Sequence, residues 1–233
     1  AQPESKPIPK ADIRNMLQAV GPIVVFTASN FPLAFSTAGG DTASALASGC
    51  PVIVKAHESH PGTNALVSEA IQRAAKKTSM PDGVFSSLNA VGYDVGSALV
   101  KDPLVKGVAF TGSHRGGMAL TRIANEREEP IPVFAEMGSV NPIFILPEKQ
   151  ANHTEHLASQ IAGSVNLGAG QFCTNPGLVV ILDNDKGVEL INYMRTAFEQ
   201  LIAQTMLNQG IYQNYEKLKS NCLGVEDITP EFV

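Results

Sequence analysis

The 233-residue sequence contains no tryptophan, only three cysteines and no run of basic residues. Seventeen lysines and arginines stand against twenty-two acidic residues, so the net charge of −5 argues against a nucleic-acid-binding protein. No apolar run approaches the ~18 residues that a membrane span needs. The three cysteines are too few for a disulfide scaffold and favour a reducing compartment. We therefore expect a cytoplasmic protein without membrane or nucleic-acid partners.

Between residues 21 and 135, short β-branched apolar runs alternate with helix-like stretches. Apolar strands joined by helices are typical of an α/β fold whose parallel sheet is covered on both faces. Ligands in such folds bind beyond the carboxyl ends of the strands, where Lys55, Ser113 and Glu136 fall. The predicted strands are 23–27, 51–54, 84–88, 108–111 and 132–135, and the predicted helices are 36–48, 63–77, 95–100 and 117–125.

A linker is predicted over residues 1–20, before the first unit, and its residues 1–10 are polar and proline-rich. A second α/β unit with fewer strands is predicted from residue 136 to residue 233. Its predicted strands are 143–146 and 178–182, and its predicted helices are 153–167 and 188–207. The last helix carries an apolar stripe that two strands cannot cover, so we expect an incomplete domain that is prone to associate. The stripe consists of Leu190, Ile191, Met194, Phe198, Leu201 and Ile202.

Cys173 ends a glycine-rich turn, Gly168-Ala169-Gly170-Gln171-Phe172-Cys173, and is a candidate nucleophile. A thiol reacts as the thiolate, which the backbone N–H groups of such a turn can stabilise. Gly-Gln-x-Cys also occurs in papain-like proteases, but those need a histidine after the nucleophile. All five histidines precede Cys173, which counts against a protease. Cys50 precedes an apolar strand and is interpreted as a buried structural cysteine.

Two polar residues follow apolar strands upstream of this turn. Glu136 comes after the strand at 132–135, where a carboxylate can activate water, although a solvated loop glutamate is the alternative. Asn30 lies between the 23–27 strand and Pro32, and its side-chain amide can donate two hydrogen bonds, as an oxyanion site requires. The alternative for Asn30 is an asparagine that fixes the turn before proline.

Two glycine-containing turns are candidates for a nucleotide site. Phe110-Thr111-Gly112-Ser113 closes a strand and opens a helix, where N–H groups attract phosphate and a serine can cap the helix. Gly92 and Gly96 flank the start of the preceding helix. Neither turn is Gly-x-Gly-x-x-Gly, so the usual Rossmann fingerprint is absent. His153 and His156 match no common zinc spacing, and we expect no metal site.

Five segments in this order resemble the aldehyde dehydrogenase superfamily, from about Ala11 to at least Gly210. They are Ser29-Asn30-Phe31-Pro32, Val54-Lys55-Ala56-His57-Glu58, Phe110-Thr111-Gly112-Ser113, Glu136-Met137-Gly138 and Gly170-Gln171-Phe172-Cys173. The resemblance implies that Cys173 is the nucleophile, Asn30 the oxyanion donor and Glu136 the base that activates water. It also implies a Rossmann-like cofactor domain at 21–135, followed by the first part of a catalytic domain at 136–233, with Met137 and Gly138 at the cofactor.

The same resemblance implies NAD or NADP as cofactor and a small aldehyde as substrate. In this family the lysine that is Lys55 here, and the glutamate that is Glu58 here, hold the adenosine ribose. A carboxylate accepts from both ribose hydroxyls and repels a 2′-phosphate, so Glu58 favours NAD, whereas Lys55 can pair with that phosphate. Around Asn30 and Cys173 the sequence looks most like the branch that acts on α-ketoglutarate semialdehyde. We also expect a homo-oligomer at full length.

Several departures from the family leave alternatives open. Ser29 stands where members usually have tryptophan, and Ser139-Val140 replaces a commoner Gly-Lys. A later Glu-x-Phe segment and an arm before the cofactor domain are missing, so we expect part of a longer enzyme that is nearly inactive alone. The alternatives are a nucleotide-binding protein without turnover and an acyl hydrolase that uses Cys173 and Glu136 without nucleotide. Formation of reduced cofactor with an aldehyde separates the first hypothesis from both.

Overall fold

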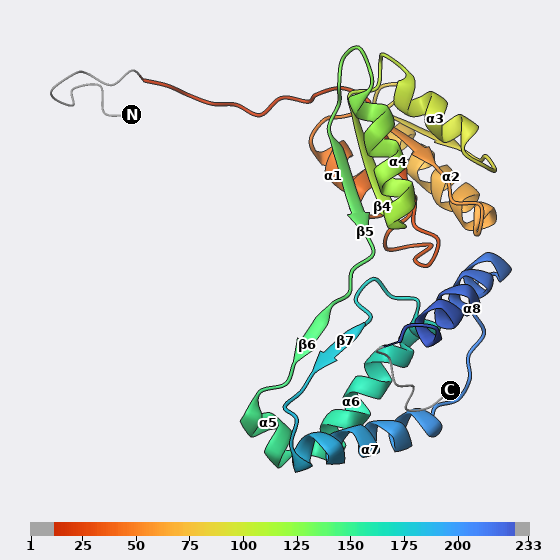
Figure 1. The fold of residues 1–233 in the computed structure, drawn as a ribbon. Coiled ribbons are helices and arrows are strands. Elements are labelled where there is room, and N and C mark those ends of the chain that lie inside the picture. Colours follow the sequence, from red (N-terminus) through yellow and green to blue (C-terminus); the bar gives the residue numbers. More distant parts are fainter. Residues whose placement is uncertain (1–11, 227–233) are drawn as a thin grey trace, which may run out of the picture. The chain divides into compact units, whose positions relative to one another are not determined.

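A computed structural model of the chain describes residues 12–226 and divides into two compact units, residues 1–136 and 137–233. Each unit has its own sheet and its own apolar core. Part of the predicted linker, residues 1–11, lies outside the described residues. Residues 12–20 are extended and exposed (Figure 1).

The first unit is built on a five-stranded sheet with the strand order β3-β2-β1-β4-β5. β1 pairs in parallel with both β2 and β4, and β2 pairs in parallel with β3. The order therefore reverses between β1 and β4, which is the position where open α/β sheets bind their ligands. The elements are β1 (Ile23–Phe26), α1 (Gly40–Ala47), β2 (Val52–Lys55), α2 (Pro61–Lys77), β3 (Phe85–Leu88), α3 (Asp94–Lys101), β4 (Gly107–Gly112), α4 (His114–Asn125) and β5 (Val133–Met137).

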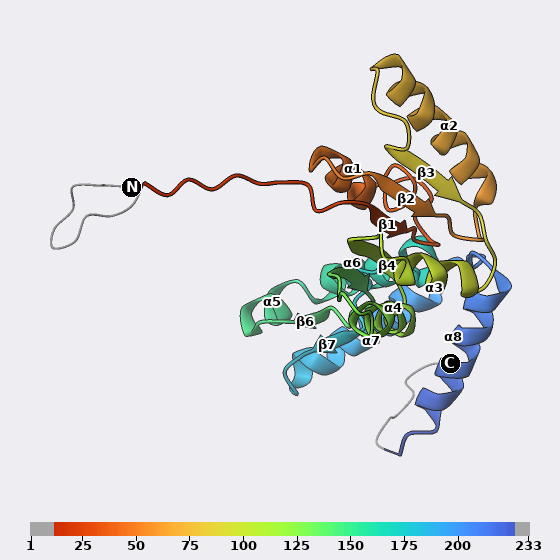
Figure 2. The same cartoon turned by 90° about the horizontal axis from the view of Figure 1, so that it is seen from above.

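Helices cover both faces of this sheet, as the apolar strands predict. Successive side chains of a strand point to opposite faces. Val24 and Phe26 of β1 pack in one cluster with side chains of α3 and α4, whereas Ile23 and Val25 pack in another with side chains of α1 and α2. Figure 2 shows α1 and α2 on one side of the sheet and α3 and α4 on the other. The predicted parallel α/β fold of this unit is confirmed.

Three predicted boundaries of the first unit are wrong by several residues. α1 begins at Gly40 instead of residue 36, because residues 36–39 form a turn closed by the Gly39 N–H and the Ser36 carbonyl. α4 begins at His114 instead of residue 117, because Ser113 caps it. β5 continues to Met137, so Glu136 lies within this strand and not after it.

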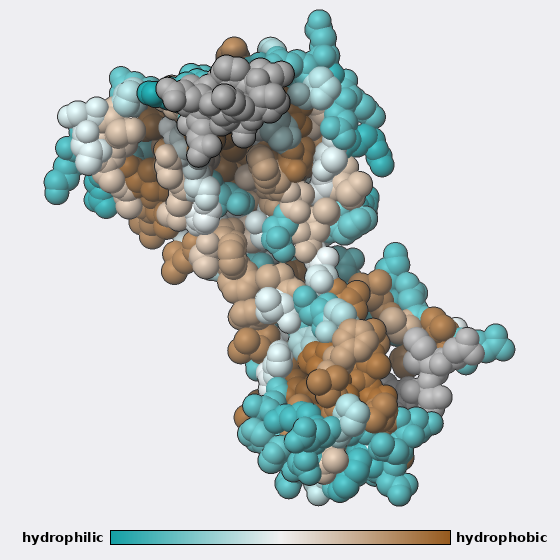
Figure 3. All heavy atoms as spheres, turned by 90° about the vertical axis from the view of Figure 1, so that its left-hand side faces the viewer, coloured by the Kyte–Doolittle hydropathy of each residue, from teal (hydrophilic) through white to brown (hydrophobic). Residues whose placement is uncertain are grey.

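The second unit holds two short parallel strands and a set of helices. Its elements are β6 (Pro142–Phe144), α5 (Pro147–Asn152), α6 (Thr154–Asn166), a 3₁₀ turn η1 (Leu167–Gly170), β7 (Leu178–Val180), α7 (Asp185–Glu199) and α8 (Gln209–Leu223). Its core joins the inner side chains of the strands to α6 and α7, with Leu190 fully buried. The other side chains of these strands, Phe144, Leu178 and Val180, stay exposed, and apolar side chains gather on this unit in Figure 3.

The single helix predicted over residues 188–207 is wrong. α7 ends at Glu199, and a new helix that the sequence interpretation missed, α8, starts after Asn208. The apolar stripe is covered only in part, because Leu190 packs against α6 whereas Ile202 is 83% exposed. α5 was also missed, since it has only six residues. Among residues 12–226, no helix is long and apolar enough to cross a membrane.

Candidate active site

Asn30 lies in the loop that leaves the carboxyl end of β1, next to the position where the strand order reverses. The Ala28 N–H donates to the Phe35 carbonyl at 2.9 Å, which closes the loop around Asn30. Asn30 itself is half-buried. The loop therefore holds a side-chain amide at the ligand-binding edge of the sheet, as an oxyanion donor requires.

Lys55 and Glu58 lie at the carboxyl end of the neighbouring strand. Lys55 is the last residue of β2 and is half-buried, whereas Glu58 is exposed. Between them, burial lowers the pKa of His57, and the electrostatic effects of His60 and Lys55 lower it further while Glu58 opposes this. A neutral imidazole thus separates the lysine from the carboxylate at this edge.

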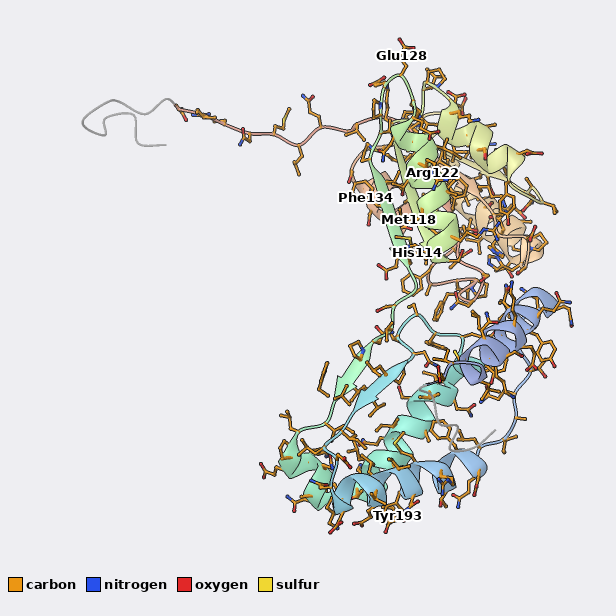
Figure 4. All side chains as sticks on the ribbon, in the orientation of Figure 1. His114, Met118, Arg122, Glu128, Phe134 and Tyr193 are labelled. Carbon is orange, nitrogen blue, oxygen red and sulfur yellow. The ribbon has the colours of Figure 1, made fainter. Side chains whose placement is uncertain are left out.

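The start of α4 follows the carboxyl end of β4. The Ser113 hydroxyl accepts from the Gly116 N–H at 3.2 Å and caps this helix, so the predicted cap is confirmed. His114 is its first residue (Figure 4), and Ser113 and His114 are exposed. The ring of Phe110 packs so closely below Gly112 that a Cβ there would lie 2.7 Å from it. The exposed first turn can therefore offer N–H groups and a positive dipole end to a phosphate.

Gly92 and Gly96 stand at the other predicted nucleotide turn, before and within α3. Gly92 has φ +77° and is exposed. Gly96 is buried, and a Cβ there would come 2.9 Å from the Phe26 ring, so its small size lets α3 approach β1. Packing thus explains Gly96, while the exposed Gly92 remains a candidate contact for a cofactor.

Glu136 shares its end of the sheet with a carboxylate that the sequence interpretation missed. Burial raises the pKa of Asp41, in the first turn of α1, and the charge of Glu136 raises it further, against a hydrogen bond from Thr111. Glu136 is exposed. The structure thus brings together Glu136, Thr111 and Asp41 within the first unit. An Asp in a first helical turn is common, so no sequence signal marked Asp41 for this site.

Cys173 belongs to the second unit and is exposed, whereas Cys50 is buried as predicted. Its main chain is held by Asn141, whose amide donates to the Cys173 carbonyl at 2.7 Å and to the Asn175 carbonyl at 3.0 Å. The Asn175 amide in turn donates to the Val165 carbonyl at 2.7 Å. These two asparagines fix the backbone on both sides of the thiol. Met137 is half-buried and Gly138 is exposed, in the stretch that leads to Asn141.

The turn before Cys173 is left-handed and is supported from the segment after α7. Gly168 and Ala169 have φ +59° and +56°, which is costly for a residue with a Cβ. The Ala169 N–H donates to Gln204 Oε1 at 3.1 Å, and the Leu207 N–H donates to Gln171 Oε1 at 2.9 Å. Residues 200–208 leave the helical path and hydrogen-bond to this turn, which explains why the predicted long helix is wrong.

The predicted site residues thus fall into two sets, one in each unit. Asn30, Lys55, Glu58, Ser113 and Glu136 belong to the first unit, and Cys173 belongs to the second. The sequence interpretation missed Asp41, Asn141 and Asn175. No cluster of three or more metal-ligating side chains occurs in residues 12–226.

Comparison with known proteins gives relatives over nearly the whole chain. A family model described as "Aldehyde dehydrogenase family" matches residues 1–210. The chain is 52% identical to alpha-ketoglutaric semialdehyde dehydrogenase 2 of Azospirillum brasilense, over 98% of this chain and 44% of that protein. It is 45% identical to alpha-ketoglutaric semialdehyde dehydrogenase of Acinetobacter baylyi, over 93% of this chain and 41% of that protein. The chain therefore spans less than half the length of these relatives.

Two solved structures show the same fold. An NAD-dependent benzaldehyde dehydrogenase from Corynebacterium glutamicum matches with a TM-score of 0.69 and 24% identity, over 87% of this chain and 44% of that one. Glyceraldehyde-3-phosphate dehydrogenase GapN of Methanocaldococcus jannaschii, complexed with NADP, matches with a TM-score of 0.74 and 22% identity, over 88% and 45%. At such identities the likeness is one of fold.

Proposed function

We propose that this chain, which belongs to the aldehyde dehydrogenase family, carries the nucleophile, the oxyanion donor and the base of an NAD(P)-dependent enzyme that oxidises an aldehyde to a carboxylic acid. The observation that carries the proposal is the exposed thiol of Cys173 at the end of a left-handed turn. That turn is hydrogen-bonded to Asn141, Asn175 and Gln204. A reactive thiol needs both access and a fixed direction of attack, and this arrangement supplies both.

The proposed chemistry begins at the thiol of Cys173. Its sulfur, after loss of the thiol proton, forms a bond to the carbonyl carbon, and the carbonyl π electrons move onto the oxygen. The Asn30 amide and the Cys173 N–H donate hydrogen bonds to that oxyanion. When bound, the nicotinamide supplies the acceptor for the hydride that the carbon loses, which leaves an acyl thioester on Cys173. Glu136 takes a proton from water, whose oxygen replaces the sulfur and releases the acid.

The residues of the first unit fit a dinucleotide. The capped, exposed N-terminus of α4 follows β4, next to the reversal of strand order, where a pyrophosphate is expected. Lys55 ends β2 and Glu58 follows it three residues later, and β2 pairs with the other side of β1 from β4. An adenosine ribose can be held there. We propose that Ser113 and the adjoining N–H groups hold phosphate and that Gly92, Met137 and Gly138 line the rest of the site.

We propose that NAD is preferred to NADP because Glu58 is exposed and can accept from both ribose hydroxyls. Glu58→Gln should raise kcat/KM for NADP relative to NAD, since it removes the charge that repels a 2′-phosphate. The matched control is Glu126→Gln, another exposed glutamate, at the end of α4. An unchanged NAD-to-NADP ratio in Glu58→Gln would show that this carboxylate does not select the cofactor.

We propose α-ketoglutarate semialdehyde as the substrate, on the strength of the identities of 52% and 45% to two enzymes named for it. The test measures reduced cofactor formed from this semialdehyde and from a simple aliphatic aldehyde, with the polypeptide as its gene encodes it. Turnover with a preference for the semialdehyde supports the proposal. Nucleotide binding without turnover, or acyl-ester hydrolysis without nucleotide, identifies one of the two alternatives.

We also propose that the protein works as a cytoplasmic homo-oligomer. Met118 of α4 and Phe134 of β5 are 42% and 67% exposed, and a second copy of the chain could cover them. Figure 4 shows Met118 between His114 and Arg122 along α4. Sedimentation of the protein and of Phe134→Lys tests the assembly, and a monomer in both would refute it.

A further inference from the structure

The loop that carries Asn30 is fastened to the loop that carries Lys55 and Glu58. His60, the N-cap residue of α2, places its Nε2 2.7 Å from the Ala28 carbonyl oxygen. Ala28 is only 1% exposed, and its own N–H is used by the Phe35 carbonyl. Both polar groups of Ala28, two residues before Asn30, are therefore held in place.

A second set of bonds fastens the same two loops one residue earlier. The His57 N–H donates to the Thr27 hydroxyl at 2.7 Å, and the Thr27 N–H donates to the Lys55 carbonyl at 3.3 Å. Thr27 is 4% exposed. Main-chain groups of the 55–60 loop thus hold Thr27, whereas a side chain of that loop, His60, holds the Ala28 carbonyl.

The chemistry of the His60 ring identifies the donor in this bond. A carbonyl oxygen only accepts, so Nε2 carries the hydrogen that it donates to Ala28. Nδ1 is buried, and no partner for it is found among the described residues. A buried polar atom without a partner is costly, and an apolar side chain would fill the space without that cost.

We infer that His60 is a positioning residue, which holds the Ala28 carbonyl so that the Asn30 amide points at the oxyanion. The inference rests on the proposed function of Asn30. It also links the two halves of the first-unit site, because the loop at 55–60 carries the proposed ribose contacts Lys55 and Glu58. His60 acts on the rate of the chemical step through Asn30, and it touches no reacting atom.

The test compares His60→Ala, His60→Gln and Asn30→Ala in the polypeptide as its gene encodes it. His60→Ala should lower kcat by roughly 10–10²-fold, the size that a misplaced catalytic group produces. The dissociation constant of the nucleotide should change little. His60→Gln should recover most of the rate, because its amide N–H can replace Nε2–H. The control His156→Gln replaces an exposed histidine of α6, outside these two loops, and should retain kcat.

A double-mutant cycle gives the decisive outcome. In the Asn30→Ala background, His60→Ala should cause no further loss of kcat, since the group it positions is gone. If the two losses of kcat multiply in the double variant, His60 does not act through Asn30. The same holds if His60→Ala and His60→Gln lose kcat equally at an unchanged melting temperature. Either outcome refutes the role of His60 and leaves the proposed role of Asn30 standing. Full kcat in Asn30→Ala would instead refute the oxyanion donor in the proposed function, and the role of His60 with it.

Discussion

The two units support their functional residues in different ways. The first unit covers both faces of a five-stranded sheet, and its strands β1, β2 and β4 are largely buried. The second unit has two strands, β6 and β7, whose outer side chains Phe144, Leu178 and Val180 remain exposed. Apolar packing thus holds the first unit together. In the second unit, side-chain-to-backbone hydrogen bonds hold the main chain around Cys173 in place.

This difference suggests where each unit is sensitive to substitution. In the first unit a loop residue such as Asn30 can be replaced while the sheet below it stays intact. In the second unit the geometry at Cys173 depends on a few amides, and each net hydrogen bond contributes only about 1 kcal/mol. We therefore expect catalytic losses without unfolding in the first unit, and coupled losses of stability and reactivity in the second.

The largest effect is expected for Asn30→Ala. Loss of one oxyanion donor typically costs ~10²–10³ in rate, about 3–4 kcal/mol of the barrier. The kcat for aldehyde oxidation should fall by that amount while nucleotide affinity and melting temperature hold. Asn125→Ala, at the exposed end of α4, is the control. A change confined to KM would mean that Asn30 only shapes the pocket.

A smaller effect is expected for Asn141→Gly in the second unit. Asn141 has φ +47°, which glycine adopts freely, so the substitution removes the two hydrogen bonds without adding strain. The second unit should lose about 2 kcal/mol of stability, and Cys173 should lose its fixed direction of attack. Hydrogen exchange in peptides from 137–226 should speed up, with 12–136 unchanged. Equal hydrogen exchange of residues 137–226 in Asn141→Gly and in the parent protein would contradict the supporting role of Asn141.

Gly168→Ala should destabilise the second unit by about 1–2 kcal/mol, the cost of a left-handed residue with a Cβ. Gly168 has φ +59°, and the added Cβ would lie 2.5 Å from the Phe172 ring. Gly163→Ala in α6 is the control, since nothing lies within 4 Å of a Cβ there. Unfolding in urea measures both variants. If Gly168→Ala is as stable as the parent, the turn is not left-handed.

The smallest effect concerns the pH dependence of the first unit. The pKa of His57 lies below its ordinary value of 6.5, chiefly because of burial, so the folded unit binds fewer protons than the unfolded chain. The neutral ring's contribution to stability is present above 6.5 and is lost as the pH falls through the lowered pKa. His57→Gln should weaken this acid-side loss in urea titrations. An identical pH profile in the variant would contradict it.

The sheet of the first unit follows from the sequence because its strands are continuous apolar runs. The site follows in part, since Asn30, Lys55, Ser113 and Glu136 come at or near strand ends. The bond from His60 to Ala28 leaves no signal in the sequence, because it joins a side chain to a carbonyl 32 residues away. The sequence did not predict the end of α7 either, because Gln204 bonds to residues that lie far away in the sequence. It accepts from the Ala169 N–H and donates to the Asn166 carbonyl, before Cys173.

The most direct test of the account is to trap the acyl group on Cys173. Glu136→Gln, mixed with aldehyde and NAD, should give a burst of reduced cofactor of about one per chain and then stall, because deacylation has lost its base. Mass spectrometry of the digested protein should then find the acyl group on the Cys173 peptide and not on Cys222, which is also exposed. Sustained turnover with an unmodified Cys173 peptide would contradict the account.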